Sequence, residues 1–460
     1  MSTPSTGRPS YAAVLRIPYA RRTFGAALLG RLSYGIVSLS VMLAVTRATG
    51  SYTVAGTVMA LFGATSVFLS PARAALVDRH GPRAALLPMA LLYAALLGTL
   101  AAASWRPGVP PVVLGAVAVA AGSCTPPLGP TMRAVWGELV GDRLLLQRAY
   151  SLDGVAEEVL FVSGPLLVGA LVQIAPPAAG VALSGLLVGA GTLAFVASPA
   201  VRDVRPSGVR RPGRDAARPS AARALVRPVV VAAGVGLCLG AVDLLVLAFA
   251  GERHHGDDVV AWVLAALSAG SAVGGLLNGA VDWRTSARVR LPLLAVGLGL
   301  ALAAAGLAPG LGTLAAAVAC AGFFVAPALT TAYLLADETA PEGSRTQAGA
   351  WVNTAVNAGS SGGTAAIGLL VGRLPLSVCF AVSGAVALLA ALVSGWGGRA
   401  TAEGAGPHMG PESPEREGDR AAEPGRSRRS RPAVASGAPS AAEGPAPSSV
   451  HGGSAGSSSR

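Results

Sequence analysis

Twelve apolar stretches, each about twenty residues long, follow one another along most of the chain and are separated by short polar segments. A helix of about 20 residues, rising about 1.5 Å per residue, matches the roughly 30 Å hydrocarbon layer of a bilayer. Repeated spans of this length are typical of helices rather than barrel strands, so the pattern predicts an all-α membrane protein. The predicted spans are 24–48, 52–72, 84–104, 109–131, 151–175, 178–200, 228–251, 258–281, 290–309, 311–336, 346–371 and 374–397.

Charged residues are scarce and unevenly distributed. They make up 13% of the chain, against about a quarter in soluble domains, and the mean hydropathy is +0.57. Every basic residue is Arg; ahead of residue 398, 22 lie on the side of the spans that holds both termini and four on the other side. The positive-inside rule therefore predicts a multi-pass plasma-membrane protein with cytoplasmic N- and C-termini. The net charge of +12 is then a signal of topology, and we expect no nucleic-acid partner.

Two changes in composition divide the chain. An Arg- and Pro-rich linker separates two groups of six spans, and a Gly-, Pro- and Ser-rich segment follows the last span. The latter has almost no large apolar side chain, so we expect a disordered cytoplasmic tail, in which 426–431 is a solvated charge run or touches anionic lipid headgroups. The expected parts are an arm without a cleavable signal peptide (1–23), an N-terminal half (24–200), the linker (201–227), a C-terminal half (228–397) and the tail (398–460).

The two halves repeat each other in register. Val77-Asp78 recurs as Val281-Asp282, displaced by 204 residues, and Pro127 recurs as Pro327, displaced by 200. Ordered matches at nearly one displacement indicate a duplicated six-helix unit. We therefore expect twelve transmembrane helices in two pseudo-symmetric six-helix halves.

The loop between the spans 52–72 and 84–104 carries a recognisable motif. Asp78-Arg79-His80-Gly81-Pro82-Arg83 resembles the D-R-x-G-R-R/K signature of the major facilitator superfamily of secondary transporters, with a partial copy at Asp282-Trp283-Arg284. The resemblance covers about residues 20–398. It implies the twelve-helix fold of that family and a latch in this loop that steadies one access state.

The residues of this loop also have a physical interpretation of their own. Gly81 permits a turn with positive φ, and Asp78 is placed to cap a helix N-terminus or to pair with a neighbouring Arg such as Arg133. The alternative is that Arg79 and Arg83 serve only as an orientation signal.

A second partial match lies in the span 151–175. Gly164-Pro165 with Gly169 resembles the G-x-x-x-G-P-x-x-G-G pattern of antiporters in the superfamily, although Leu160 and Val168 replace two of its glycines. Antiport is thereby favoured over uptake. Whatever the substrate, Pro165 removes a helix hydrogen bond and the glycines allow close helix contact, so a bend and a tight interface are expected.

Ionisable residues inside the spans are the sharpest functional signal, because each is costly in the bilayer unless it is paired or hydrated. Arg31 and Glu157 each lie about seven residues from the expected cytoplasmic end of their spans, roughly 10 Å, and are expected to pair beside the central cavity. The pair either responds to substrate or protons and so biases the access states, or is a static link between helices. Asp153 shares a helix face with Glu157 but is expected to face water near the helix start.

Two further features bear on proton coupling. Asp243 lies about fifteen residues into the span 228–251 with no basic residue on that span; it either binds protons reversibly or is hydrated from an outer vestibule. Antiporters of the superfamily commonly carry an Arg in the middle of the fourth span, whereas the corresponding stretch, Leu114–Gly129, has no ionisable residue. Coupling by that usual route is therefore in doubt.

The other polar residues expected to line the cavity are few: Tyr34, Ser123, Thr125, Tyr333, Trp351, Asn353 and Asn357. The two Asn are displaced by 200 residues from Asp153 and Glu157 and either face substrate or form interhelical hydrogen bonds. Pro127 and Pro327 are expected to bend their helices. So few fixed charges favour an amphiphilic organic substrate over a sugar or phosphate.

No sequence motif indicates nucleotide binding, a metal site or covalent catalysis, so we expect no enzyme activity and no cofactor, with the proton gradient as the energy source. The four Cys lie in apolar spans as packing residues, and His254-His255 is explained better as part of an exposed loop than as a metal site. The leading hypothesis is a monomeric bacterial transporter, surrounded by membrane lipid, that exports a small amphiphilic molecule by alternating access. The alternatives are an uptake permease for a metabolite and a non-transporting membrane sensor that signals through the tail.

Overall fold

The computed structural model describes residues 10–202, 219–254, 257–341 and 343–403, and its secondary-structure elements there are all helices. The all-α prediction is therefore confirmed for this part of the chain. The predictions for the start of the arm, for 203–218 of the linker, for His255 and for 404–460 of the tail, including 426–431, lie outside the described residues.

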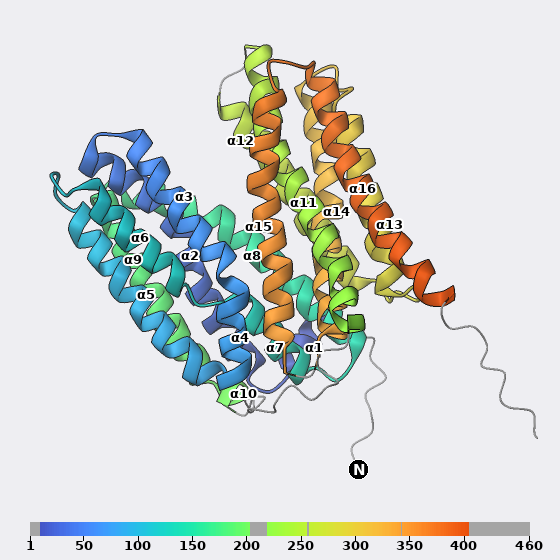
Figure 1. Cartoon of the computed structure of the whole chain (residues 1–460), viewed down its shortest axis with the longest axis horizontal. Helices are drawn as coiled ribbons and strands as arrows, with labels where there is room; N and C mark the ends of the chain where they lie inside the picture. The colour runs from blue at the N-terminus through green and yellow to red at the C-terminus, as the bar shows by residue number, and fades with distance from the viewer. Residues whose placement is uncertain (1–9, 203–218, 255–256, 342, 404–460) are drawn as a thin grey trace, which may run out of the picture. The chain divides into compact units, whose positions relative to one another are not determined.

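The N-terminal half begins with the short α1 and ends with the short α10, and two of its predicted spans consist of two helices each (Figure 1). The predicted span 52–72 is the pair α3 and α4, bent by 41°. The predicted span 109–131 is α6 and α7, which extends to residue 139. The elements are α1 (Tyr11–Arg16), α2 (Ala20–Thr49), α3 (Tyr52–Phe68), α4 (Ser70–His80), α5 (Pro82–Ser104), α6 (Pro111–Cys124), α7 (Leu128–Leu139), α8 (Arg143–Leu171), α9 (Pro177–Val196) and α10 (Pro199–Arg202).

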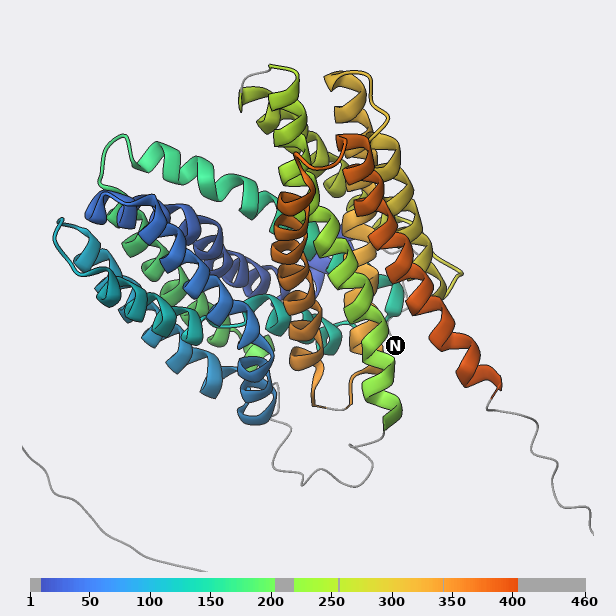
Figure 2. The same cartoon turned by 45° about the horizontal axis from the view of Figure 1, so that its top comes forward.

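The C-terminal half consists of six long helices, which form a second group beside the first in the turned view of Figure 2. They are α11 (Pro219–Glu252), α12 (Asp257–Ala280), α13 (Ala287–Ala305), α14 (Leu311–Thr339), α15 (Arg345–Leu370) and α16 (Leu376–Glu403). The first of them begins inside the predicted linker, so residues 219–227 extend a membrane helix.

Ten helices of the described residues are long and apolar enough to cross a membrane, counting α6 with α7 as one, and the bent pair α3 and α4 makes an eleventh. The remaining predicted span is α15, which has 26 residues but carries many Thr, Asn, Ser and Gly side chains. Its length suits a bilayer while its composition suits a helix that contacts protein and water more than lipid. The twelve predicted spans therefore all correspond to helices.

Glycines bring the helices of each half into backbone contact. A Cβ at Gly191 of α9 would overlap the backbone of Gly30 in α2, and a Cβ at Gly164 of α8 would overlap that of Gly35. In the other half, Gly236 and Gly240 of α11 lie equally close to the backbone of α15. Because lipid offers no hydrophobic drive for helix association, such close van der Waals packing holds membrane helices together.

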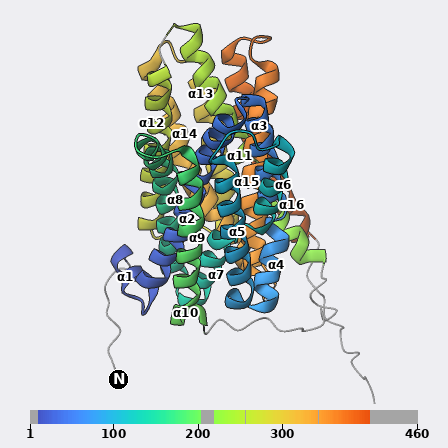
Figure 3. The same ribbon diagram turned by 90° about the vertical axis from the view of Figure 1, so that its left-hand side faces the viewer.

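The two halves meet at one end of the bundle, which we call the arginine-rich end. It contains the helix connections at Gly81, 140–142 and 281–286 and the described residues 340, 341, 343 and 344, and α1 and α10 lie there too (Figure 3). Helices α4 and α7 of the first half contact α15 there, and α8 contacts α12 and α14. This is the end that the distribution of Arg predicts to be cytoplasmic.

Side chains of α8 form most of the polar contacts across this end. Arg148 donates to Asp282, with 2.6 Å between Nη2 and Oδ1. Gln147 donates to the carbonyl oxygen of Asn278 at 2.5 Å and accepts from Arg290 at 2.9 Å. The first turn of α8 adds an exposed ion pair, Arg143 with Glu338 of α14, at 2.6 Å.

Candidate functional site

Two Arg and two acidic side chains converge inside the N-terminal half, and we call them the four-charge cluster: Arg31, Arg133, Asp153 and Glu157. Arg31 of α2 reaches Asp153 at 2.6 Å and Glu157 at 3.1 Å. Arg133 of α7 reaches the second oxygen of each carboxylate, at 2.9 Å for Asp153 and 2.5 Å for Glu157. Each carboxylate of α8 thus bridges both guanidinium groups, and the formal charges cancel.

The local sequence explains this convergence. Pro126 and Pro127 lack backbone N–H groups, and α6 ends two residues before them. The chain then restarts as α7 with Pro127 as its N-cap residue. Arg133 therefore lies on helix α7, in the interior of the N-terminal half. Asp153 and Glu157 lie one helical turn apart on α8, so both face the same neighbours.

Exposure separates the members of the cluster. The Asp153 side chain is 0% exposed, and both arginines are nearly as buried, whereas the Glu157 side chain is 29% exposed. Tyr333, on α14 of the other half, stacks on the guanidinium of Arg133, with 3.8 Å from Cζ to the ring centroid. The cluster is therefore accessible mainly at Glu157 and touches the second half through Tyr333.

The structure contradicts one expectation, excludes one alternative and confirms one expected contact. Asp153 was expected to face water and is fully buried, because both arginines turn toward it. Arg133, which the sequence offered as one of two alternative partners for Asp78, pairs with the acidic residues of α8. The expected contact between Arg31 and Glu157 is present. The Arg in the fourth span was missed because the sequence assigned Arg133 to a loop.

Asp78 caps a helix of the opposite half. Its carboxylate accepts the backbone N–H groups of Thr346 and Gln347, at 3.2 Å and 2.8 Å, in the first turn of α15. These groups have no partner within their own helix, and a negative charge is favoured at a helix N-terminus. Of the two arrangements expected for Asp78, helix capping is the one that forms.

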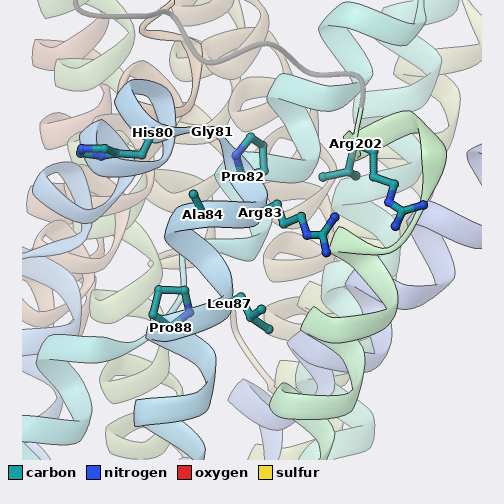
Figure 4. A pocket seen from close by; sticks show the side chains of 9 residues that line it. His80, Gly81, Pro82, Arg83, Ala84, Leu87, Pro88 and Arg202 are labelled. Atoms are coloured by element: carbon teal, nitrogen blue, oxygen red, sulfur yellow. The ribbon is translucent and has the colours of Figure 1, made fainter.

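The rest of the loop motif shapes the arginine-rich end. Gly81 has a φ of +84°, as a turn between α4 and α5 requires. Arg79 is exposed and has no ion pair among the described residues. Arg83 lines a cavity of about 450 Å³ together with His80, Pro82 and Arg202, shown in Figure 4. This cavity includes no member of the four-charge cluster.

Three of the expected cavity residues use their hydroxyl groups on the backbone around the break between α6 and α7. Tyr34 donates to the carbonyl of Pro126 at 2.5 Å, Ser123 to that of Val119 at 2.8 Å, and Thr125 to that of Gly122 at 3.1 Å. The carbonyls of Pro126 and Gly122 also accept the backbone N–H groups of Leu128 and Thr125, so the hydroxyl groups there add second hydrogen bonds. Their first role is structural.

The expected polar residues of α15 do not link helices. The Asn357 amide donates to the carbonyl oxygen of Asn353 at 2.8 Å, within the same helix, so the described contacts do not support the interhelical alternative. Trp351 is 44% exposed. On α11, Asp243 is exposed and has no hydrogen bond or ion pair with described residues.

The expected bends differ among the proline positions. The helix breaks at Pro127, where α6 gives way to α7. Both α8 and α14 run as single helices through Pro165 and Pro327, and the bends expected there stay predictions. Gly164, next to the first of these prolines, makes the tight contact with α2 that the sequence led us to expect.

Sequence reasoning missed two polar contacts, each at least partly buried. Arg73 of α4 donates to the carbonyl oxygens of Ser66, Gly122 and Ser123, at 2.5, 2.9 and 3.1 Å, and so caps the C-terminal ends of α3 and α6. Ser271 of α12 donates to Glu158 of α8 at 2.9 Å, across the two halves. The sequence signal for Arg73 was Pro71, two residues earlier, which stands at the start of α4.

Two repeated six-helix groups joined at one end, with a neutral charge cluster inside one group, define a membrane protein of the secondary-transporter class. The sequence matches the family described as Major Facilitator Superfamily over residues 23–255 and 244–435. The chain belongs to this family. No curated protein sequence matches it.

Several solved transporter structures share the fold. A bacterial homologue of the iron transporter ferroportin, in its outward-facing state, is 14% identical with a TM-score of 0.62, covering 82% of this chain and 97% of that one. The human organic anion transporter MFSD10 (TETRAN) is 16% identical with a TM-score of 0.63, covering 84% and 100%. The E. coli fucose:proton symporter FucP is 15% identical with a TM-score of 0.57, covering 83% and 99%. At these identities the likeness is one of fold.

Proposed function

We propose that the protein is a proton-linked secondary transporter that exports a small amphiphilic organic compound by alternating access. The observation that carries the proposal is the four-charge cluster, because buried charges in a membrane protein are costly and are kept where they serve function. Glu157 is its accessible acidic member and faces both arginines. Binding of a proton or a substrate at Glu157 would break its ion pairs with Arg31 and Arg133 and so change the balance between the inward- and outward-facing states.

The proposed orientation follows from the distribution of Arg. With the arginine-rich end in the cytoplasm of a bacterial cell, both termini are cytoplasmic, and the closure of this end corresponds to an outward-facing state. The contacts of Asp78 with α15 and of Arg148 with Asp282 would then hold the cytoplasmic gate closed. Their breakage and reformation would accompany each transport cycle.

The proposed transporter needs few partners. We propose a monomer in the plasma membrane, with a small-molecule substrate, surrounding lipid, and no cofactor beyond the proton gradient. The proposed direction, export, rests on the antiporter-like pattern at Gly164-Pro165. Uptake of a metabolite and signalling through the tail are the competing functions.

A proton-flux assay tests the proposal. The purified full chain is reconstituted in liposomes with an imposed pH gradient, and the gradient is followed while amphiphilic acids, amines, neutral compounds and sugars are added. We expect a subset of compounds to dissipate the gradient with wild type and with Glu252→Gln, a matched change at the exposed outer end of α11, but not with Glu157→Gln. Equal fluxes in wild type and Glu157→Gln would refute a coupling role for the cluster, and no flux of any compound with the full wild-type chain would favour the sensor.

A further inference from the structure

The four-charge cluster has one replaceable member. Asp153 and Glu157 occupy equivalent places, each with one oxygen on Arg31 and the other on Arg133. Asp153 is completely enclosed, whereas 29% of the Glu157 side chain is exposed. An incoming group can therefore reach the two arginines at the place that the Glu157 carboxylate fills.

The charge balance dictates what such a group must be. With Glu157 ionised, the two Arg and two acidic side chains sum to zero; with Glu157 neutralised, one positive charge remains. An uncompensated charge in the membrane interior is strongly unfavourable. A monoanion restores neutrality, whereas a cation would add to the positive charge of Arg31 and Arg133.

The arginines also have unused hydrogen-bonding capacity. Arg133 Nη1 and Arg31 Nη2 are buried and donate no well-aligned hydrogen bond to any described residue, although Arg31 Nη2 lies 3.1 Å from Glu157. Planar guanidinium groups bind carboxylates and related oxyanions in two-pronged geometry. The ring of Tyr333 covers a face of Arg133 and supplies an apolar wall from the second half.

We propose that the transported compound is an amphiphilic organic monoanion whose acidic group replaces the Glu157 carboxylate on Arg31 and Arg133. This inference rests on the proposed transport function and specifies its substrate class. The displaced Glu157 side chain takes up a proton on its carboxylate, so anion and proton occupy the same loaded state. The loaded site is then as neutral as the empty one.

The surroundings of Glu157 fit this exchange. Charged and titratable groups face it from α2 through Arg31, from α7 through Arg133 and from α14 through Tyr333, while its own helix contributes Asp153 and Glu158. In the empty site the two guanidinium groups hold Glu157 as a carboxylate. Loss of those contacts to a competing anion, with two acidic neighbours remaining, favours its protonation.

The scheme has a consequence for the direction of coupling. A proton and an anion that share the loaded state cross the membrane together. Export in this mode runs when the outward gradient of the anion exceeds the opposing proton gradient. Coupling in this mode is cotransport, so the pattern at Gly164-Pro165 no longer supports export and the direction follows from the two gradients.

Ligand-induced thermal stabilisation of the full chain in nanodiscs tests the substrate class. The probes are octanesulfonate, which stays anionic at every pH used, octylammonium and octanol. We expect octanesulfonate alone to stabilise wild type, more at mildly acidic than at mildly alkaline pH. In Glu157→Gln we expect it to bind about tenfold more tightly with the pH dependence lost, while Glu252→Gln behaves as wild type.

A second measurement needs no variant. In weakly buffered solution with a pH indicator, wild type should take up about one proton for each octanesulfonate bound, as linkage requires when binding and protonation are coupled. Preferential binding of octylammonium or octanol, weaker anion binding in Glu157→Gln, or anion binding without proton uptake would each overturn the inference. Gradient-driven flux of a cation in liposomes would overturn it while leaving the proposed transport function intact.

Discussion

At the scale of single residues, the arrangement of charge matters more than its amount. Arg133 meets two carboxylates and an aromatic ring within 4 Å, whereas Arg79, in the neighbouring loop motif, lies exposed without an ion pair among the described residues. A buried ion pair adds little net stability, but removal of one partner leaves an uncompensated charge. Substitutions at these two arginines should therefore differ sharply in effect.

We expect Arg133→Met to lower the stability of the protein by about 3–5 kcal/mol, because Asp153 and Glu157 would then share a single arginine. The combined variant Arg133→Met with Glu157→Gln restores the charge balance and should recover much of the loss. Thermal unfolding in detergent, followed by intrinsic fluorescence, measures the stabilities of wild type, the two single variants and the combined variant. Arg79→Met is the control, with an expected change within about 0.5 kcal/mol; additive losses in the combined variant would argue against direct coupling.

Asp243 provides a second residue-scale prediction. Its side chain is exposed on α11 and has no partner among the described residues. We expect Asp243→Asn to leave thermal stability unchanged within about 0.5 kcal/mol, and to lower the number of protons moved per substrate if this carboxylate carries a proton during transport. Proton and substrate fluxes measured together in liposomes give the number of protons moved per substrate. If this ratio is unchanged in Asp243→Asn, Asp243 carries no proton during transport and is only hydrated in an outer vestibule.

At the scale of helices, glycine contacts set the packing of the N-terminal half. Gly164 of α8 lies against the backbone of Gly35, while Gly169 of the same helix has open space around it. We expect Gly164→Ala to destabilise the protein by about 1–3 kcal/mol through overpacking. Gly169→Ala should be neutral or slightly stabilising, since Ala favours the helix. Thermal unfolding of the two variants side by side provides the measurement; equal behaviour would mean that α2 and α8 can separate at little cost.

The helices also show how far the sequence could predict this molecule. Spans, duplication and family follow from hydrophobic length and repeated motifs, and the structure and the family match bear them out. The i, i+4 pair on α8 and its approach to Arg31 also follow from helical geometry. The position of Arg133 could not be predicted from the sequence. Helix α7 restarts beyond two prolines, and the direction of a restarted helix depends on tertiary packing.

The capping of α15 by Asp78 illustrates the same limit. The sequence offered two partners for this carboxylate, a helix N-terminus and an arginine. Neither residue spacing nor charge could decide between them. Only the meeting of α4 with α15, which belong to different halves, brings the N–H groups of Thr346 and Gln347 within reach. Contacts between distant segments are set by the fold and have no local signal.

At the scale of the whole bundle, the two copies of the loop motif act differently on the same closed end. Asp78 binds backbone N–H groups of α15, whereas Asp282 binds the Arg148 side chain of α8. The Asp78 side chain is half-buried, whereas the Asp282 side chain is 47% exposed, so salt screens the ion pair of Asp282 more strongly. The two sides of the closed end should therefore respond differently to ionic strength.

Asp78→Ala should shift the bundle toward the state in which the arginine-rich end is open. Loss of the cap costs about 0.5–2 kcal/mol, and because Asp78 joins the halves, that loss falls only on the closed state. Distances between spin labels at positions 106 and 253, both exposed at the opposite end, report the change in a background without native cysteines. Opening of one end closes the other, so we expect a larger population of short distances in Asp78→Ala. Arg79→Ala changes a neighbour that has no ion pair with any described residue, so it should keep the wild-type distribution. If Asp78→Ala keeps it too, the cap stabilises α15 alone and other contacts of α8 hold the halves together.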